Sequence, residues 1–180
     1  MTTIIREHHK MNKKITAICF LITLCAVLSG GCITRDVHEI NRLRAIEEPD
    51  LKCSQLIGYL GRWPLAIGNP SRLAQEGLIE SRSGALPYIK AALHDKERDS
   101  RARTLLLEAW VEILERESVP LLLDVARDRE ETPGQRATAL CLLKKLNARV
   151  ALPTAESLYL DETQPRAVRR AAKRAYRALK

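Results

Sequence analysis

Cys32 is the residue of this chain whose surroundings point most clearly to a chemical reaction. Lys13 and Lys14 precede a run from Ile15 to Leu28 without a charged residue, and small residues then lead into the cysteine. This order of basic, apolar and small-residue segments is typical of a secretory signal. The apolar run is shorter than the about 20 residues that a membrane-spanning helix needs. A thiol directly after a cleavage site can act as the nucleophile that accepts a lipid group.

The residues around this thiol, Leu28-Ser29-Gly30-Gly31-Cys32, resemble the lipobox of bacterial lipoprotein precursors, with the leucine one position earlier than in most such boxes. The resemblance implies that residues 1–31 are a signal peptide, with Met11 as the natural start, and that Cys32 becomes the lipidated first residue. One acyl chain anchors a protein only marginally, so such lipoproteins typically carry two or three. An ordinary cleaved signal, or an uncleaved anchor with a chance cysteine, is the alternative.

Three residues within the predicted signal or just after it bear on location and on metal binding. Ile33 follows the lipidated cysteine, where an aspartate would retain a lipoprotein in the inner membrane. The resemblance therefore implies attachment to the outer membrane, facing the periplasm, if the organism has one. His8 and His9 would be removed with the signal, so we do not interpret this pair as a metal site.

No other group of side chains has the spacing of an active site or a metal site. His38 and His94 are far apart in the sequence, and no cysteine or histidine cluster has the spacing of zinc ligands. Cys53 and Cys141 form no recognisable disulfide framework, which favours two separate thiols over a bridge. Phosphate-binding glycine loops and nucleophile-elbow signatures are absent from the sequence. We therefore expect no enzyme and no cofactor other than the covalent lipid on Cys32.

A repeat of 33 residues organises the second half of the chain. It places one proline, one aspartate and one arginine in each unit: Pro87, Pro120 and Pro153, then Asp95, Asp128 and Asp161, then Arg103, Arg136 and Arg169. Apolar columns recur at the spacing of one helix face. They predict a core of Leu106, Ala109, Trp110, Ile113, Leu122, Val125, Ala139, Leu142, Leu143, Leu146, Leu158, Ala172, Ala175 and Leu179. Each unit is thus expected to contain two helices, the first beginning near its proline.

Neither helix of such a unit can bury its apolar face alone, so the units should stack into an α-solenoid. The segment Pro120–Asp128, followed by Arg136 and a helical run, resembles a HEAT repeat of the compact bacterial kind that also occurs in phycobilin lyases. The resemblance implies that the recurring aspartates and arginines hydrogen-bond within or between units. Ankyrin and tetratricopeptide units have similar lengths, but their signatures are absent. An irregular helical bundle is the alternative.

The predicted fold is therefore all-α. Residues 32–48 form the lipidated N-terminus and a tether, and residues 49–180 form the HEAT-like solenoid, with a degenerate unit at 49–84 and repeats at 85–117, 118–150 and 151–180. The spacing of apolar residues before Pro49 fits either a short helix on the body or part of the tether. A helix should begin at Pro49 with Leu51 on its apolar face, and Ser71 should cap the next helix.

The positive charge of the chain, +8 in total, gathers in its last segment. Residues 32–161 contain nineteen basic and twenty acidic residues, whereas residues 162–180 contain seven and one. On a helix, the seven cations occupy one sector of about 140°. We call them the basic stripe: Arg166, Arg169, Arg170, Lys173, Arg174, Arg177 and Lys180. The stripe is either the polar outer face of a capping helix or a surface for acidic lipid or an acidic partner.

The sequence favours a lipid-anchored interaction scaffold of the cell envelope, which binds the membrane through Cys32 and an envelope protein through the solenoid. Nucleic acid is not expected as a partner, because the protein is predicted to be exported and the stripe lacks interleaved aromatic residues for base stacking. The alternatives are an accessory or chaperone-like subunit of an envelope enzyme, and a binder of anionic surfaces through the basic stripe.

Overall fold

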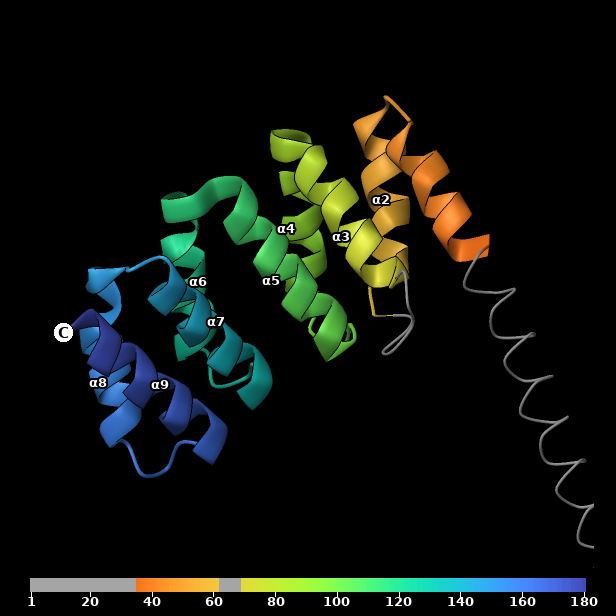
Figure 1. Cartoon of the computed structure of the whole chain (residues 1–180). Coiled ribbons are helices and arrows are strands. Elements are labelled where there is room, and N and C mark those ends of the chain that lie inside the picture. The colour runs from red at the N-terminus through yellow and green to blue at the C-terminus, as the bar shows by residue number, and fades with distance from the viewer. Residues whose placement is uncertain (1–34, 62–68) are drawn as a thin grey trace, which may run out of the picture.

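The computed structural model describes residues 35–61 and 69–180. Cys32, Ile33 and the predicted signal peptide lie outside the described residues. Within them, all regular secondary structure is helical, which confirms the predicted all-α class (Figure 1). No helix of this part of the chain is both long and apolar enough to cross a bilayer.

The first described helix spans residues 35–44. Ile40 and Leu43 on this helix are completely or almost completely buried, so the helix packs on the body. Arg44 on this helix forms an ion pair with Glu80. The Arg44 guanidinium is the largest cause of the lowered pKa of the Glu80 carboxyl. Of the two interpretations of this region, the structure thus shows a packed helix over the described residues.

Two further helices complete the N-terminal part, α2 (Pro49–Tyr59) and α3 (Pro70–Glu80). The helix predicted to begin at Pro49 is confirmed, but Leu51 is 45% exposed and does not belong to the core face. Ser71 does not cap α3, because the cap position is Asn69. The Ser71 hydroxyl instead donates to the carbonyl oxygen of Tyr59 at 3.2 Å and ties α3 to α2.

Three pairs of helices follow, each preceded by a short 3₁₀ turn. The turns are η1 (Arg82–Ala85), η2 (Glu115–Ser118) and η3 (Arg149–Ala151). The first helices of the pairs are α4 (Leu86–His94), α6 (Val119–Arg127) and α8 (Leu152–Leu160). The second helices are α5 (Ser100–Leu114), α7 (Pro133–Lys145) and α9 (Arg166–Leu179). Both series of helices begin at intervals of 33 residues, as the sequence repeat predicts.

Local chemistry explains where these helices begin. Pro87, Pro120 and Pro153 each lie in the first turn of their helix, where the missing N–H has no intrahelical acceptor. Asp99 caps α5 by accepting from the backbone N–H groups of Arg101 and Ala102, and the Thr132 hydroxyl caps α7. The prediction that the first helices start at the prolines is therefore confirmed.

The two helices of each pair pack on one another, and the second helices form a continuous series of contacts from α3 through α5 and α7 to α9 (Figure 1). Most of the predicted core is buried, including Leu106, Leu122 and Leu143 without any exposed area. Four residues of the predicted core are only half-buried and pack against its edge: Trp110, Ile113, Val125 and Leu146. Alanines such as Ala139 and Ala172 at the helix contacts let the backbones approach closely.

Candidate functional site: the grooves between helix pairs

Arg103 joins the first helix pair to the second. Its guanidinium donates to the carbonyl oxygen of Leu93, ten residues earlier, at 2.9 Å. The same group donates two hydrogen bonds, of 2.6 and 2.5 Å, to the carboxylate of Glu131, 28 residues later. Both side chains are buried, with exposures of 3% for Arg103 and 7% for Glu131. A bidentate pair of this kind fixes orientation as well as distance.

Arg136 makes the same connection one repeat later, with a neutral partner. It donates to the carbonyl oxygen of Ala126, ten residues earlier, at 3.0 Å and to the side-chain oxygen of Gln164, 28 residues later, at 2.8 Å. The exposures, 3% for Arg136 and 7% for Gln164, repeat those of the first connection. Burial lowers the pKa of Arg136, and the cation of Arg129 lowers it further.

We call these two arrangements the Arg103 joint and the Arg136 joint. Glu131 and Gln164 were not among the predicted site residues, although they stand 33 positions apart in the sequence. Because one side chain is a carboxylate and the other an amide, alignment of the repeats did not reveal this recurring position. Arg169, the third arginine of the series, has a buried Nε atom without a hydrogen-bond partner, and its side chain donates to no described residue.

The three recurring aspartates differ from one another. Asp128 accepts from Lys96 of the preceding helix pair at 2.8 Å, and this cation is the largest cause of the lowered pKa of Asp128. The Asp161 carboxylate accepts from the Thr163 hydroxyl at 2.6 Å and from the Gln164 amide, which together with the Thr163 backbone N–H lower its pKa to about 2. Asp95 has only a loose contact of 3.6 Å with Arg98.

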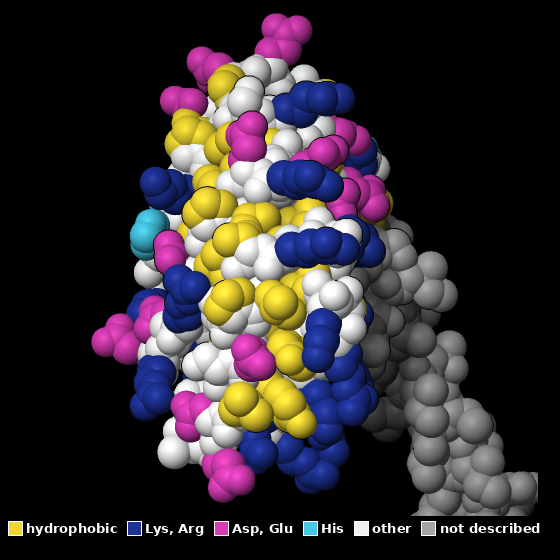
Figure 2. Space-filling view, turned by 90° about the vertical axis from the view of Figure 1, so that its left-hand side faces the viewer, with side chains coloured by type: hydrophobic (Ala, Val, Ile, Leu, Met, Phe, Trp, Pro, Cys, Tyr) yellow, Lys and Arg dark blue, Asp and Glu magenta, His cyan; other side chains and the backbone are white. Residues whose placement is uncertain are grey.

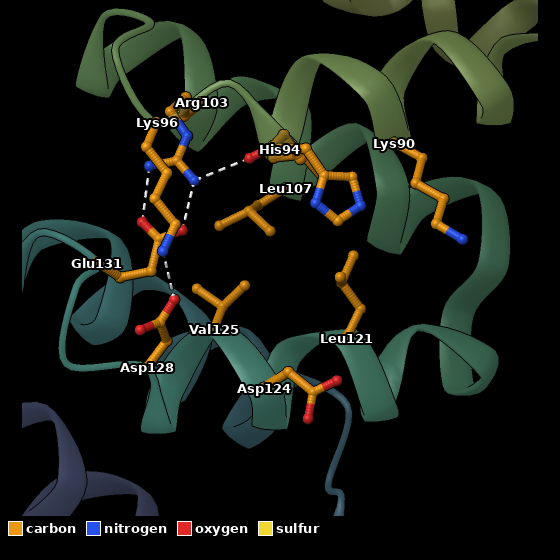
Figure 3. A pocket seen from close by; sticks show the side chains of 11 residues that line it. Lys90, His94, Lys96, Arg103, Leu107, Leu121, Asp124, Val125, Asp128 and Glu131 are labelled. Atoms are coloured by element: carbon orange, nitrogen blue, oxygen red, sulfur yellow. Dashed lines mark hydrogen bonds and ion pairs between the residues drawn. The ribbon is translucent and has the colours of Figure 1, made fainter.

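A groove of about 210 Å³ lies beside the Arg103 joint, between α4 and α6 (Figure 3). Leu107, Leu121 and Val125 extend toward its centre from the two sides (Figure 3). Lys90, His94 and Asp124 stand at its rim, and all three side chains are exposed. Unlike the neighbouring Lys96 and Asp128, Lys90 and Asp124 form no ion pair with a described residue. The groove therefore combines an apolar interior with charges of both signs that can meet a ligand.

A second groove, of about 370 Å³, lies beside the Arg136 joint. Its lining contains the counterparts, one repeat later, of eight of the eleven residues of the first groove, with Pro153 in addition: Arg127, Arg129, Arg136, Thr154, Ser157, Leu158, Asp161 and Gln164. Thr154 replaces Leu121, and no counterpart of Leu93 or Leu107 lines this groove, so the second groove is less apolar. Arg127 donates to the Thr154 hydroxyl at 2.6 Å and is thereby held across the groove.

The basic stripe lies on α9, at the end of the molecule that faces the viewer in Figure 2. There, Lys and Arg side chains gather beside hydrophobic side chains in the middle of the face (Figure 2). None of the seven cations forms an ion pair with a described residue. Lys173 lies 5.2 Å from the ring centre of Tyr159, and Lys180 lies 5.8 Å from that of Tyr176. The stripe therefore keeps its charge available to an external anion.

The cysteines and the acidic residues add no further candidate centre. Cys53 is buried and Cys141 is exposed, and both are free thiols, as predicted. Burial raises the pKa of the Cys53 thiol and thereby disfavours its ionisation to the reactive thiolate. Within residues 35–61 and 69–180, no group of three or more His, Cys, Asp or Glu side chains could hold a metal ion. Over the described residues, this geometry offers contact surface, which includes the two grooves beside the arginine joints and one cationic face.

Comparison with models of protein families, with curated proteins and with solved structures finds no match for this chain.

Proposed function

We propose that this chain is a lipid-anchored interaction module of the cell envelope. In this proposal the acylated Cys32 holds a HEAT-like α-solenoid at a membrane, and the grooves between its units bind another protein. The outer membrane, on its periplasmic side, is the proposed location in an organism that has one. The module itself performs no reaction and assembles or positions its partner.

The recurrence of contacts supports the solenoid. Each arginine joint connects residues of one helix pair to the side chain of the next pair, 28 residues later. The second helices contact one another in sequence order, α5 with α7 and α7 with α9. Contacts that run only between neighbouring units are the defining property of a solenoid. In an irregular bundle, a buried arginine connection is not expected to recur at the interval of the sequence repeat.

One observation carries the binding function: the two grooves recur at the interval of the repeat. Stacked repeats create an extended surface on which each junction offers one site. The first groove provides apolar side chains inside and unpaired charges at the rim, Lys90 and Asp124. A partner segment can place an apolar side chain in the groove and meet the rim with polar groups, which is the usual composition of a binding site.

Affinity capture of the full-length lipoprotein from detergent-solubilised envelope tests this proposal. The groove variant combines Lys90→Ala with Asp124→Ala, which leaves the net charge unchanged and touches no described hydrogen bond. The control variant combines Arg116→Ala with Glu117→Ala, a matched pair of exposed charges in η2. We expect a protein that is recovered with the wild type and the control but is lost with the groove variant. Equal recovery with all three chains, or no recovered protein, would contradict the groove assignment.

The membrane anchor has a separate test. Cys32→Ser removes the proposed nucleophile, so we expect an unprocessed precursor that incorporates no labelled fatty acid. Fractionation of the wild-type protein should place it with outer-membrane markers, because Ile33 is not a retention residue. A labelled and trimmed serine variant would disprove lipidation at Cys32, and a wild-type protein in the inner-membrane fraction would disprove the location.

A further inference from the structure

The two grooves have walls of opposite charge. The first wall of each groove comes from the earlier helix pair and carries cations: Lys90, Lys96 and Arg103 in the first groove, and Arg127, Arg129 and Arg136 in the second. The second wall comes from the later pair and carries acidic or amide groups: Asp124, Asp128 and Glu131, then Asp161 and Gln164. In both of these grooves, cations on the first wall thus face carboxylate or amide oxygens on the second.

The face of α8 and α9 that points away from α6 and α7 carries the residues that correspond, by the repeat, to the first wall of a groove. Leu160, Arg169 and Lys173 stand one repeat after Arg127, Arg136 and Leu140. Leu160 is 64% exposed, and Arg169 donates no side-chain hydrogen bond to a described residue. Two acidic residues break the pattern: Glu162 stands where Lys96 and Arg129 carry cations, and Glu156 stands two repeats after Lys90. Arg169 is thus the one cation of the earlier walls that the third unit keeps. No described residue provides the second wall.

Six of the seven residues of the basic stripe divide into two halves when they are aligned with the earlier units, and Lys180 belongs to neither half. Arg169 and Lys173 align with covered positions in both earlier units, Arg103 and Leu107 of α5 and Arg136 and Leu140 of α7. Arg177 aligns with the covered Val111 of α5 but with the exposed Lys144 of α7. We call Arg169, Lys173 and Arg177 the junction half. Arg166, Arg170 and Arg174 align with the exposed or half-buried Ser100, Thr104 and Glu108, and we call them the outer half. Only the junction half occupies positions that are covered in an earlier unit.

We infer that the junction half, together with Leu160, is a docking surface for an acidic segment of a partner protein. The segment places a carboxylate against Arg169, as Glu131 does against Arg103, and an apolar side chain against Leu160. The two earlier junctions favour a protein segment over a lipid headgroup, because in both of them the arginine binds a side-chain oxygen held beside apolar residues. This surface is separate from the grooves of the proposed function.

A peptide with the sequence of residues 118–135 is the probe, because it contains the second wall of the first groove and carries four acidic against two basic residues. Its binding to the full-length chain in detergent is measured by fluorescence anisotropy. We expect binding that weakens with salt, since exposed charges are screened beyond about 8 Å at physiological ionic strength. A peptide with Asp124→Asn, Asp128→Asn and Glu131→Gln should bind at least tenfold more weakly.

Two double variants of the full-length chain locate the binding surface. Arg169→Gln with Arg177→Gln changes the junction half, and Arg166→Gln with Arg174→Gln changes the outer half of the same helix by the same charge. We expect at least a tenfold loss of affinity for the first and less than a twofold loss for the second. Circular dichroism verifies that each variant folds, and Lys173→Gln is a second junction-half variant should the first fail to fold. The groove variant with Lys90→Ala and Asp124→Ala should bind the peptide like the wild type, which separates this test from that of the proposed function.

Three results would overturn the inference. The first is equal loss of affinity in the two double variants, which would indicate attraction by charge alone. The second is absence of peptide binding, or equal binding of the peptide with the three carboxylates replaced. The third concerns lipid: if phosphatidylglycerol added to the micelles displaces the peptide, phosphatidylcholine does not, and the junction-half variant abolishes the displacement, the surface binds acidic lipid instead.

Discussion

The Arg103 joint and the Arg136 joint have the same geometry but different chemistry. In each, a buried arginine donates to a carbonyl oxygen ten residues earlier and to a side chain 28 residues later. The first acceptor is a carboxylate and the second is a neutral amide. The comparison teaches that the junction needs a hydrogen-bond acceptor at this place, whereas a full negative charge is not needed for the geometry. A junction with a structural role tolerates either a charged or a neutral acceptor at the same position of the repeat.

The largest effect should come from breaking the Arg103 joint on its cationic side. Arg103→Met leaves the Glu131 carboxylate buried without its partner, which typically reduces the free energy of unfolding by about 3–5 kcal/mol. Arg169→Met is the matched control, because its side chain has no hydrogen-bond partner among the described residues. It should change the free energy of unfolding by less than about 0.5 kcal/mol. Urea denaturation that gives equal losses for the two variants would contradict the distinction between them.

A variant in the apolar core of α7 provides a scale for the effect of Arg103→Met. Leu142 on α7 is 8% exposed, and Leu142→Ala removes buried apolar area and leaves a cavity, which reduces the free energy of unfolding by about 2–5 kcal/mol. Because the site is not completely closed, we expect a value in the lower half of that range. A reversible denaturation experiment that yields less than about 1 kcal/mol would show that this face of α7 is not packed as described.

Exchanging the acceptors should have a small effect. Glu131→Gln converts the Arg103 joint into the chemistry of the Arg136 joint, and Gln164→Glu makes the reverse change. The Arg136 joint already holds a buried arginine against a neutral amide, and each exchange keeps the hydrogen-bond acceptor, so we expect changes of about 1 kcal/mol or less, the size of one hydrogen bond. Thermal unfolding monitored by circular dichroism provides the comparison with Arg103→Met. A loss as large as that of Arg103→Met would show that the charge itself is required.

The smallest expected effect concerns acid stability at the second junction. The pKa of Asp161 is lowered from 3.8 to about 2 in the folded chain by hydrogen bonds to its ionised form. A lowered folded-state pKa stabilises the fold above the unfolded-state value, and this stabilisation is lost as the pH falls from 3.8 toward about 2. Asp161→Asn should therefore destabilise the protein at neutral pH, and the difference from the wild type should shrink over that pH range. A difference that stays constant with pH would show that the ionised form of Asp161 is not stabilised.

The sequence predicted the features that depend on one residue and its helix. The prolines identified the first turns of α4, α6 and α8, because proline at this position removes no intrahelical hydrogen bond. The HEAT resemblance implied hydrogen bonds within or between units at the recurring arginines, and Arg103 and Arg136 make such bonds whereas Arg169 does not make one with a described residue. Leu51 was misplaced because the first turn of α2 lies at the outside of the body, which hydrophobicity alone does not reveal.

The parts that the sequence did not predict depend on contacts between distant segments. Glu131 and Gln164 share no side-chain type, so their common role appears only when the next helix pair is placed against Arg103 and Arg136. The packing of residues 35–44 was left open because three apolar positions fit a tether as well as a helix. The grooves arise from the distance between helix pairs, which a repeat period does not contain.

A double-mutant cycle between Arg103 and Glu131 tests the central claim, that these arginine joints hold successive helix pairs together and thereby form the grooves. The free energy of unfolding is measured for the wild type, Arg103→Met, Glu131→Met and the double variant. Residues in direct contact couple by about 0.5–3 kcal/mol, and for a buried bidentate pair we predict a value in the upper half of that range. Losses that add to within about 0.5 kcal/mol would show that the two residues are independent, and would contradict the account of the junctions.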